Sequence, residues 1–169
     1  MQLQDVPTEG LDEKYRDWIG FIAETHHASD PRVNDPVPFA LLTKPLAEAR
    51  VALLTTAGAH LDDQVPFHIE TVAGDPSFRE IPNDVDVRRI RFTHTHYDTS
   101  SAAKDPNVVL PITRLAELVE RGRIGSASPV HFGMMGFNPN SGPVADELGP
   151  TIAERLVEHE VDVALFVPG

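Results

Sequence analysis

RVALLTT, residues 50–56, is the stretch that decides the fold of this chain. Its apolar residues are consecutive rather than alternating, which is typical of a short strand buried on both faces of a parallel sheet. A second run of this kind, VDVALFV, occupies residues 161–167. Shorter runs predict further strands at residues 87–92, after a long turn-rich excursion over 57–86, and at residues 128–132. Because helical patterns separate these strands, we expect βαβ units and a mostly parallel sheet.

Apolar residues recur at helical spacing in three places. The first is an amphipathic helix at residues 11–26, followed by a Pro- and Asp-rich connector at 29–38. The second helix opens at Pro111 and ends before Gly122, where helix chemistry favours these two residues. In the third, Pro150 marks either a kink or the true first turn, and the apolar positions are Val144, Leu148, Ile152 and Leu156. The predicted fold class is α/β: an open, mostly parallel sheet with flanking helices, in a Rossmann-like or flavodoxin-like three-layer arrangement.

Composition limits the classes of protein to consider. The 169 residues suit one α/β domain, with an N-terminal helix and connector at 1–44 and a main region at 45–169. The formal net charge of -12, without a dense Lys/Arg cluster, argues against nucleic acid as a partner. The sequence has neither a signal-peptide pattern nor the run of roughly 18 apolar residues of a membrane span, so we expect a cytoplasmic protein without a membrane partner. The 169 residues include no cysteine, which excludes disulfides and thiolate chemistry within them.

The side chains richest in chemistry follow the strand predicted at 87–92. In open α/β sheets, ligands bind beyond the carboxyl ends of the strands, where loops and helix N-termini converge. His94, His96 and Asp98 alternate there, so they project from one face if the strand continues through them. Imidazole titrates near neutral pH, and a nearby carboxylate raises its basicity. We therefore predict that these three residues are catalytic and either transfer protons or position the substrate.

Two alternatives for His94, His96 and Asp98 stay open. One is a polar strand end whose side chains hydrogen-bond neighbouring loops. The other is a metal site, because the His-x-His-x-Asp spacing resembles the metal motif of metallo-β-lactamase-type hydrolases. That motif normally continues with a further histidine, where this chain has Thr99. We predict no metal at the site and keep a metal-dependent hydrolase as an alternative function.

Four further residues are predicted to bind substrate: Gly58, His60, Asp75 and Asp105. Gly58 follows a strand and could let backbone approach a ligand, although a tight turn is the simpler explanation for one glycine. His60 lies in the segment after that strand, where ordinary loop polarity is the alternative. Asp75 and Asp105 both precede a proline, and each could instead fix a turn or cap a helix.

Five blocks of the sequence form a more specific pattern when they are taken in order. They are VALLTTAGAHL at 51–61, GDPSFREIP at 74–82, HTHYD at 94–98, DPNVVLP at 105–111 and GRIG at 122–125. In this order they resemble the selenoprotein B family of glycine/sarcosine/betaine/D-proline reductases. The resemblance covers most of residues 45–169.

The resemblance implies a subunit of an oxidoreductase that cleaves a carbon–nitrogen bond reductively. The redox group of such proteins is a selenocysteine, or a cysteine in its place, after a strand similar to residues 163–168. No such residue is present up to Gly169, so we expect a selenocysteine just beyond it, with its codon read as a stop and the sheet incomplete at the C-terminus. A naturally short homologue is the alternative.

The resemblance also implies partners. These are a small amine or amino-acid substrate and either other reductase subunits or a thioredoxin-like reductant. No cofactor is expected within the 169 residues, and this chain alone is expected to be inactive. The competing functions are a catalytically empty module, which binds a ligand or assembles with a partner, and the metal-dependent hydrolase.

Overall fold

The computed structural model describes residues 40–71 and 73–169. The helix predicted at 11–26 and the connector predicted at 29–38 lie outside the described residues. Within the described ranges, no helix combines the length and the apolar character needed to cross a membrane.

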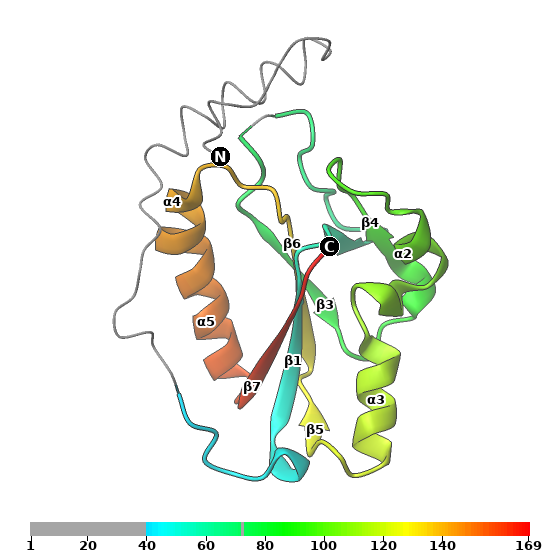
Figure 1. Ribbon diagram of the computed structural model, residues 1–169, viewed down its shortest axis with the longest axis vertical. Helices are drawn as coiled ribbons and strands as arrows, with labels where there is room; N and C mark the ends of the chain where they lie inside the picture. Colours follow the sequence, from blue (N-terminus) through cyan, green and yellow to red (C-terminus); the bar gives the residue numbers. More distant parts are fainter. Residues whose placement is uncertain (1–39, 72) are drawn as a thin grey trace, which may run out of the picture.

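Five strands form the main sheet, with β1 (Arg50–Thr55) near its centre. β7 (Val163–Val167) pairs in parallel with β1 along most of its length and so occupies one side of it. The other side is shared by β5 (Ser126–Ala127), next to the beginning of β1, and β6 (Val130–Met134), next to its end. β3 (Phe78–Pro82) pairs antiparallel with β6. The order across the sheet is therefore β3, then β6 with β5, then β1, then β7 (Figure 1).

Helical segments connect the strands, and a small second sheet lies outside the main one. That second sheet pairs β2 (Ala59–Leu61) antiparallel with β4 (Ile90–Phe92). The described helical segments are η2 (Leu46–Glu48), η3 (Val87–Arg89), α2 (Ser100–Lys104), η4 (Pro106–Val108), α3 (Ile112–Glu120), α4 (Ser141–Pro143), η5 (Val144–Leu148) and α5 (Gly149–Glu158).

The main sheet lies between α3 on one face and α5 on the other (Figure 1). Side chains of β1 alternate between these two layers, because successive residues of a strand point to opposite faces. Leu53 packs in a buried cluster with Leu115 of α3, whereas Leu54 packs in a second buried cluster with Ile152 of α5. The run at 50–56 is thus buried on both faces, and the predicted open, mostly parallel α/β fold is confirmed.

The strand predicted at 161–167 is confirmed as β7, but it is not a core strand like β1. Within the described residues β7 pairs with β1 alone, so it is the edge of the sheet. Leu165 is 48% exposed and Phe166 is 63% exposed. An apolar sequence indicated burial, whereas the position at the edge leaves both side chains in contact with solvent.

Two strands lie within the excursion at 57–86, where none was predicted. β2 has only three residues, and β3 contains the charged residues Arg79 and Glu80, which break the apolar pattern. The guanidinium of Arg79 donates to the backbone carbonyls of Val65 and Pro66. The carboxylate of Glu80 pairs with Arg155 of α5 at 2.7 Å. Since both charges have partners, the strand is stable without the apolar alternation that would have revealed it.

The strand predicted at 87–92 is shorter than expected, and it does not belong to the main sheet. Residues 87–89 form η3, and Asp86 caps this turn by accepting a hydrogen bond from the N–H of Arg88. Only Ile90–Phe92 is a strand, and it pairs with β2 outside the main sheet. The strand predicted at 128–132 is displaced to Val130–Met134, because Pro129 has no N–H and separates it from β5.

The two C-terminal helices have the predicted boundaries. α3 follows Pro111, and Gly122 beyond its end has a φ of 63°, a left-handed conformation that glycine adopts readily. Pro150 lies at the first turn of α5, directly after the π-helical segment η5. In that segment Gly149 donates to the carbonyl of Val144, five residues back. This wider turn joins η5 to α5 and accommodates the missing N–H of Pro150.

Candidate functional site

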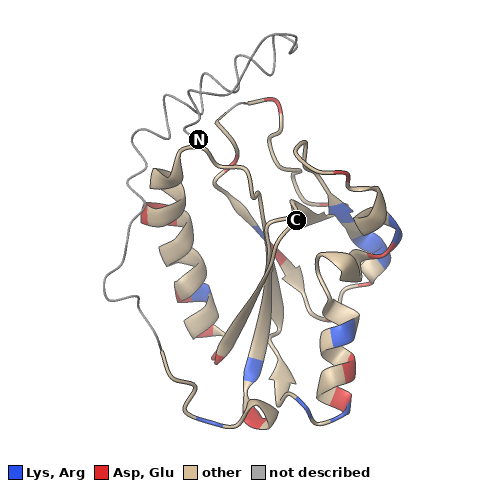
Figure 2. Cartoon of the chain, viewed as in Figure 1, with Lys and Arg blue, Asp and Glu red and all other residues tan. Residues whose placement is uncertain are grey.

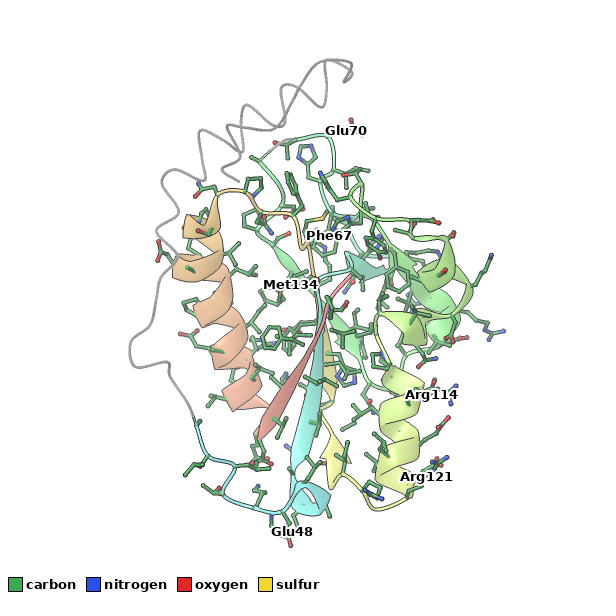
Figure 3. The ribbon with its side chains drawn as sticks, viewed as in Figure 1. Glu48, Phe67, Glu70, Arg114, Arg121 and Met134 are labelled. Atoms are coloured by element: carbon green, nitrogen blue, oxygen red, sulfur yellow. The ribbon has the colours of Figure 1, made fainter. Side chains whose placement is uncertain are left out.

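The carboxyl ends of β1, β6 and β7 meet at one end of the sheet. Ala57, just after β1, is fully buried there and forms an isolated bridge with Met135, just after β6. Gly169, after β7, packs against Ala57 so closely that an added Cβ would lie 2.4 Å from the Ala57 Cα. Figure 3 shows Met134 and Phe67 toward this end and Glu48 at the opposite end. We call this end the carboxyl edge, comprising residues 56–58, 93–98, 135–138 and 168–169.

The loop at 93–98 is attached to the carboxyl edge by two hydrogen bonds. The N–H of Thr93 donates to the carbonyl of Gly58 at 3.0 Å. The hydroxyl of Tyr97 donates to the carbonyl of Ala57, also at 3.0 Å. Burial raises the pKa of Tyr97, so its hydroxyl stays protonated and able to donate. The loop therefore lies next to the end of β1 although β4 belongs to the other sheet.

Four rings from two loops gather at the carboxyl edge. The ring of His94 lies edge-on to those of His96 and Tyr97, with centroid distances of 5.7 and 4.9 Å. The ring of His96 stacks on that of Phe137 at 3.9 Å, with 18° between the planes. Phe137 comes from the loop after β6, so the stack joins that loop to the loop at 93–98. We call His94, His96, Tyr97 and Phe137 the His–aromatic cluster.

The strand does not continue through the three predicted catalytic residues. β4 ends at Phe92, and the chain bends so that the N–H of His96 donates to Nδ1 of His94 at 3.0 Å. Asp98 instead accepts hydrogen bonds from the N–H and the hydroxyl of Ser100, both at 2.9 Å, which lower the pKa of the Asp98 carboxyl. The structure thus brings His94 and His96 together, while Asp98 stabilises the first turn of α2.

His94 is held in its neutral form more strongly than an ordinary histidine. Partial burial lowers the pKa of His94, and the neighbouring His96 lowers it further. Because Nδ1 accepts from the backbone, the proton of the neutral ring is on Nε2. His94 can therefore donate a hydrogen bond through Nε2, and its imidazolium form is a stronger acid than usual.

His60 is 4% exposed and lies beneath the same loop. Its Nδ1 is 2.8 Å from the carbonyl of Leu61, which can only accept, so Nδ1 carries a proton. In the neutral ring Nε2 then accepts from the hydroxyl of Thr93, also at 2.8 Å. Both partners belong to the chain, and the ring of His60 packs edge-on against Phe67. A cleft of about 500 Å³ opens beside this pair, and it is lined by His60, Ile90, Arg91, Phe92, Thr93 and Ala103.

The other three residues predicted to bind substrate contact other residues of the chain. Asp75 accepts hydrogen bonds from the N–H groups of His68 and Ser77 and from the hydroxyl of Ser77. Burial alone would raise the pKa of the Asp75 carboxyl, but these hydrogen bonds outweigh it and the pKa is lowered. Asp105 accepts from the N–H and the side-chain amide of Asn107, which lowers its pKa. Gly58 has a φ of 70°, and an added Cβ would lie 2.1 Å from the carbonyl oxygen of Thr93. The close approach at Gly58 is therefore made by the backbone of Thr93, to which the carbonyl of Gly58 is also hydrogen-bonded.

The relation of this chain to known proteins rests on its match to one family model. Residues 24–168 match the model described as glycine/sarcosine/betaine reductase selenoprotein B. The chain belongs to this family. Two of the five sequence blocks lie at the carboxyl edge: 51–61 carries the turn at Ala57, and 94–98 carries most of the His–aromatic cluster.

Two curated relatives belong to reductase systems. The chain is 35% identical over 137 residues to the D-proline reductase subunit gamma of Acetoanaerobium sticklandii, a match that covers 81% of this chain and 55% of that protein. It is 30% identical over 135 residues to the glycine reductase complex component B subunit gamma of Symbiobacterium thermophilum, covering 78% of this chain and 31% of that subunit. The chain thus spans about half the length of the first relative and about a third of the second. No solved structure matches the chain.

The described residues offer no set of ligands for a metal ion. Over residues 40–71 and 73–169, no three His, Cys, Asp or Glu side chains are grouped so that they could hold a metal ion. The metal-dependent hydrolase alternative required His94, His96 and Asp98 to converge, and Asp98 is bonded to Ser100 instead. The geometry therefore gives that alternative no support.

Sequence patterns did not single out Phe137 or Thr93. Phe137 lies in the loop after β6, and only folding brings it onto His96. Thr93 precedes the histidines by one residue and bonds to His60, which is 33 residues earlier. The one available signal was position: both residues come just after strands, where α/β sheets bind ligands.

Proposed function

We propose that this chain is a subunit of a cytoplasmic reductase complex of the glycine and D-proline reductase type. Its substrate would be a small amine or N-methylated amino acid, and its partners would be other reductase subunits or a thioredoxin-like reductant. The reaction would be reductive cleavage of a carbon–nitrogen bond at the carboxyl edge, with a selenocysteine or cysteine that follows Gly169. Family membership and the two reductase relatives support the class of reaction.

The observation that carries the proposal is the contact between the end of β7 and the turn at Ala57. Gly169 packs on Ala57 and donates its N–H to the hydroxyl of Thr56 at 3.1 Å. Tyr97 of the His–aromatic cluster donates to the carbonyl of the same Ala57. A residue that follows Gly169 therefore starts next to the histidine loop, which favours a reaction site shared by the two segments.

The proposal gives different tasks to the two kinds of group. A selenolate or thiolate supplies the nucleophile, and a dithiol supplies the two electrons that the cleavage consumes. The departing amine takes up a proton. We assign His94 to this proton transfer, because its loop lies next to the end of β7 and its neutral ring can take up a proton from the dithiol and pass it to the amine. The lowered pKa of His94 favours the release of that proton. His96, stacked on Phe137, would hold the loop at 93–98 in place, so that His94 stays next to the substrate.

The nucleotide sequence after the codon of Gly169 tests the position of the redox residue. We expect a UGA codon, or a cysteine codon, followed by an open reading frame. A different stop codon directly after Gly169, or the lack of an open frame beyond it, would contradict this part of the proposal. Reading the frame costs one sequencing run and needs no active protein.

Substitution of His94 tests its catalytic task. The full reading frame should be produced together with the reductase subunits encoded nearby, and dithiol consumption measured with glycine, sarcosine, betaine and D-proline. We expect His94→Gln to lower the rate by about 10²- to 10⁴-fold, the usual contribution of a general acid. His68→Gln is the matched control, because His68 is an exposed histidine outside the cluster, and its rate should change by less than about twofold. A His94→Gln protein with the wild-type rate would exclude His94 from the reaction, and a wild-type complex inert with all four substrates would contradict the proposed function.

A further inference from the structure

We propose that the cleft beside His60 binds a small 2-hydroxycarboxylate, whose carboxylate is held by Arg91 and whose hydroxyl is held by Thr93. The cleft lies between the small sheet of β2 and β4 and the helix α2. Its volume of about 500 Å³ is in the range of about 300–1,000 Å³ that small-molecule sites usually have. The inference concerns binding alone, so it does not depend on the proposed reductase function.

One face of the small sheet supplies the polar groups of the cleft. His60 of β2 is paired with Arg91 of β4, and residues directly opposite each other in an antiparallel pair lie on the same face. Thr93 follows Arg91 by two residues, and its hydroxyl reaches the ring of His60, so Thr93 lies on that face as well. The other three lining residues are apolar: Ile90, Phe92 and Ala103. The cleft thus combines a short polar row with an apolar surround.

The buried ring of His60 determines what the hydroxyl of Thr93 can offer to a ligand. The carbonyl of Leu61 can only accept, so the Nδ1 of His60 carries the proton of the neutral ring, and Nε2 accepts from Thr93. A hydroxyl has one proton and two lone pairs. Because the proton of Thr93 is used by His60, its lone pairs remain for a ligand. Thr93 therefore selects a ligand group that donates a hydrogen bond.

The guanidinium of Arg91 is held in place and still has a free side. Its Nη1 donates to the backbone carbonyls of Arg88 at 2.6 Å and Ile90 at 3.0 Å. Its Nη2 is 3.8 Å from Asp62, too far for a hydrogen bond, and Asp62 is already bonded to Arg89 at 3.0 Å. Within the described part of the chain, Nε and Nη2 donate to no acceptor. These two nitrogens present parallel N–H groups, the arrangement that binds a carboxylate through two hydrogen bonds.

The charge near Arg91 favours an anion at this place. The formal net charge of the chain is -12, but Arg88, Arg89 and Arg91 follow one another closely in the run RRIR. Figure 2 shows this basic segment at β4 and just before it. The carboxylates nearby are paired with the first two arginines: Asp86, Asp62 and Asp63. An anion is therefore repelled less beside Arg91 than over most of the acidic surface.

These two groups together define the class of ligand. A carboxylate fits the free side of Arg91, and the adjacent carbon must then carry a group that donates to Thr93. A hydroxyl has one proton, which Thr93 satisfies. An ammonium has three, so the remaining N–H groups would face the apolar part of the cleft without acceptors, which weakens binding. A 2-hydroxycarboxylate with a short alkyl chain is therefore favoured over the corresponding amino acid and over the unsubstituted acid.

Titration of the full-length protein with three related acids tests the class of ligand. 2-Hydroxybutanoate, butanoate and 2-aminobutanoate share one carbon skeleton and differ only in the group beside the carboxylate. Shifts of backbone amide signals in NMR spectra measure the affinity and should locate the ligand at residues 60, 90–93 and 103. We expect 2-hydroxybutanoate to bind at least about threefold more tightly than either of the other acids, the factor that one neutral hydrogen bond supplies. Tightest binding by butanoate or 2-aminobutanoate, or no shift at these residues with any of the acids at about 10 mM, would overturn the proposal.

Two pairs of variants test the two contacts separately. Arg91→Gln should weaken binding of 2-hydroxybutanoate at least about tenfold, because charge-assisted hydrogen bonds are lost. Arg121→Gln is the matched control, since Arg121 lies just after α3 with 71% of its side chain exposed, and its affinity should change by less than about twofold. Thr93→Val removes the acceptor and should bind 2-hydroxybutanoate and butanoate equally, whereas Thr93→Ser keeps a hydroxyl and should keep the preference. Wild-type affinity in Arg91→Gln, or the wild-type preference in Thr93→Val, contradicts the assignment of that residue and with it the proposed ligand.

Discussion

Replacing Gly133 by alanine is expected to lower the free energy of unfolding by at least about 3 kcal/mol. Gly133 lies in β6, between β3 and β1, with an ordinary backbone conformation. A Cβ at this position would lie 1.9 Å from the carbonyl oxygen of Ala59, which no contact between real atoms allows. The oxygen belongs to the backbone of β2, and β2 cannot easily shift. Ala59 is paired with Phe92, and Gly58 donates its N–H to the carbonyl of Met134 at 2.9 Å.

Urea unfolding followed by far-ultraviolet circular dichroism measures this effect. Gly122→Ala is the matched control, because Gly122 has a φ of 63° and nothing lies within 4 Å of its added Cβ. That substitution should lower the free energy of unfolding by only about 1 kcal/mol, the strain of an alanine in the left-handed backbone region. Gly133→Ala must therefore be clearly the more damaging of the two. If both variants lose the same small amount of stability, β2 does not pack closely against Gly133.

The second large effect is acid destabilisation through His131. This side chain is fully buried in β6, where Nδ1 accepts from the N–H of Leu53 at 3.1 Å and Nε2 donates to the side-chain carbonyl of Asn83 at 3.0 Å. Burial lowers the pKa of His131 to about 4, against 6.5 for an ordinary histidine. Between these two values the unfolded chain binds a proton that the folded chain does not, so stability falls as the pH falls. The difference corresponds to about 3 kcal/mol over the whole window.

Urea unfolding between pH 7.5 and pH 5.0 tests this sign and size. The wild-type chain should lose about 2 kcal/mol through His131 over this interval, because the titration of the folded state near pH 4 is not yet reached. His131→Gln should be less stable at pH 7.5, since it disturbs two buried hydrogen bonds, but its stability should change less with pH. His68→Gln, at an exposed histidine, should keep the wild-type slope. A His131→Gln slope as steep as the wild-type slope would show that His131 is not the group responsible.

The candidate site was predictable in place but not in geometry. The rule that ligands bind beyond carboxyl ends of strands selected the loop with His94 and His96, and both lie at the carboxyl edge. The same reasoning assumed that alternation continues past Phe92 and therefore grouped Asp98 with them. Asp98 lies two residues before Ser100, the first residue of α2. Its carboxylate therefore accepts hydrogen bonds from the N–H and the hydroxyl of Ser100, which are close to it in the chain. Short-range hydrogen bonds of this kind compete with the backbone hydrogen bonds of a strand. An alternating sequence pattern does not show which of the two will form.

The sequence by itself determined the elements whose apolar pattern is long and uninterrupted. β1, β7, α3 and α5 were predictable because a strand or helix buries a regular set of side chains, and burial is what the pattern records. The tertiary structure alone decided what depends on neighbours distant in the chain. It placed the charged strand β3 beside β6, made apolar β7 an edge, and stacked Phe137 on His96 across two loops. These features arise from contacts between segments tens of residues apart, and local periodicity contains no information about which segments will meet.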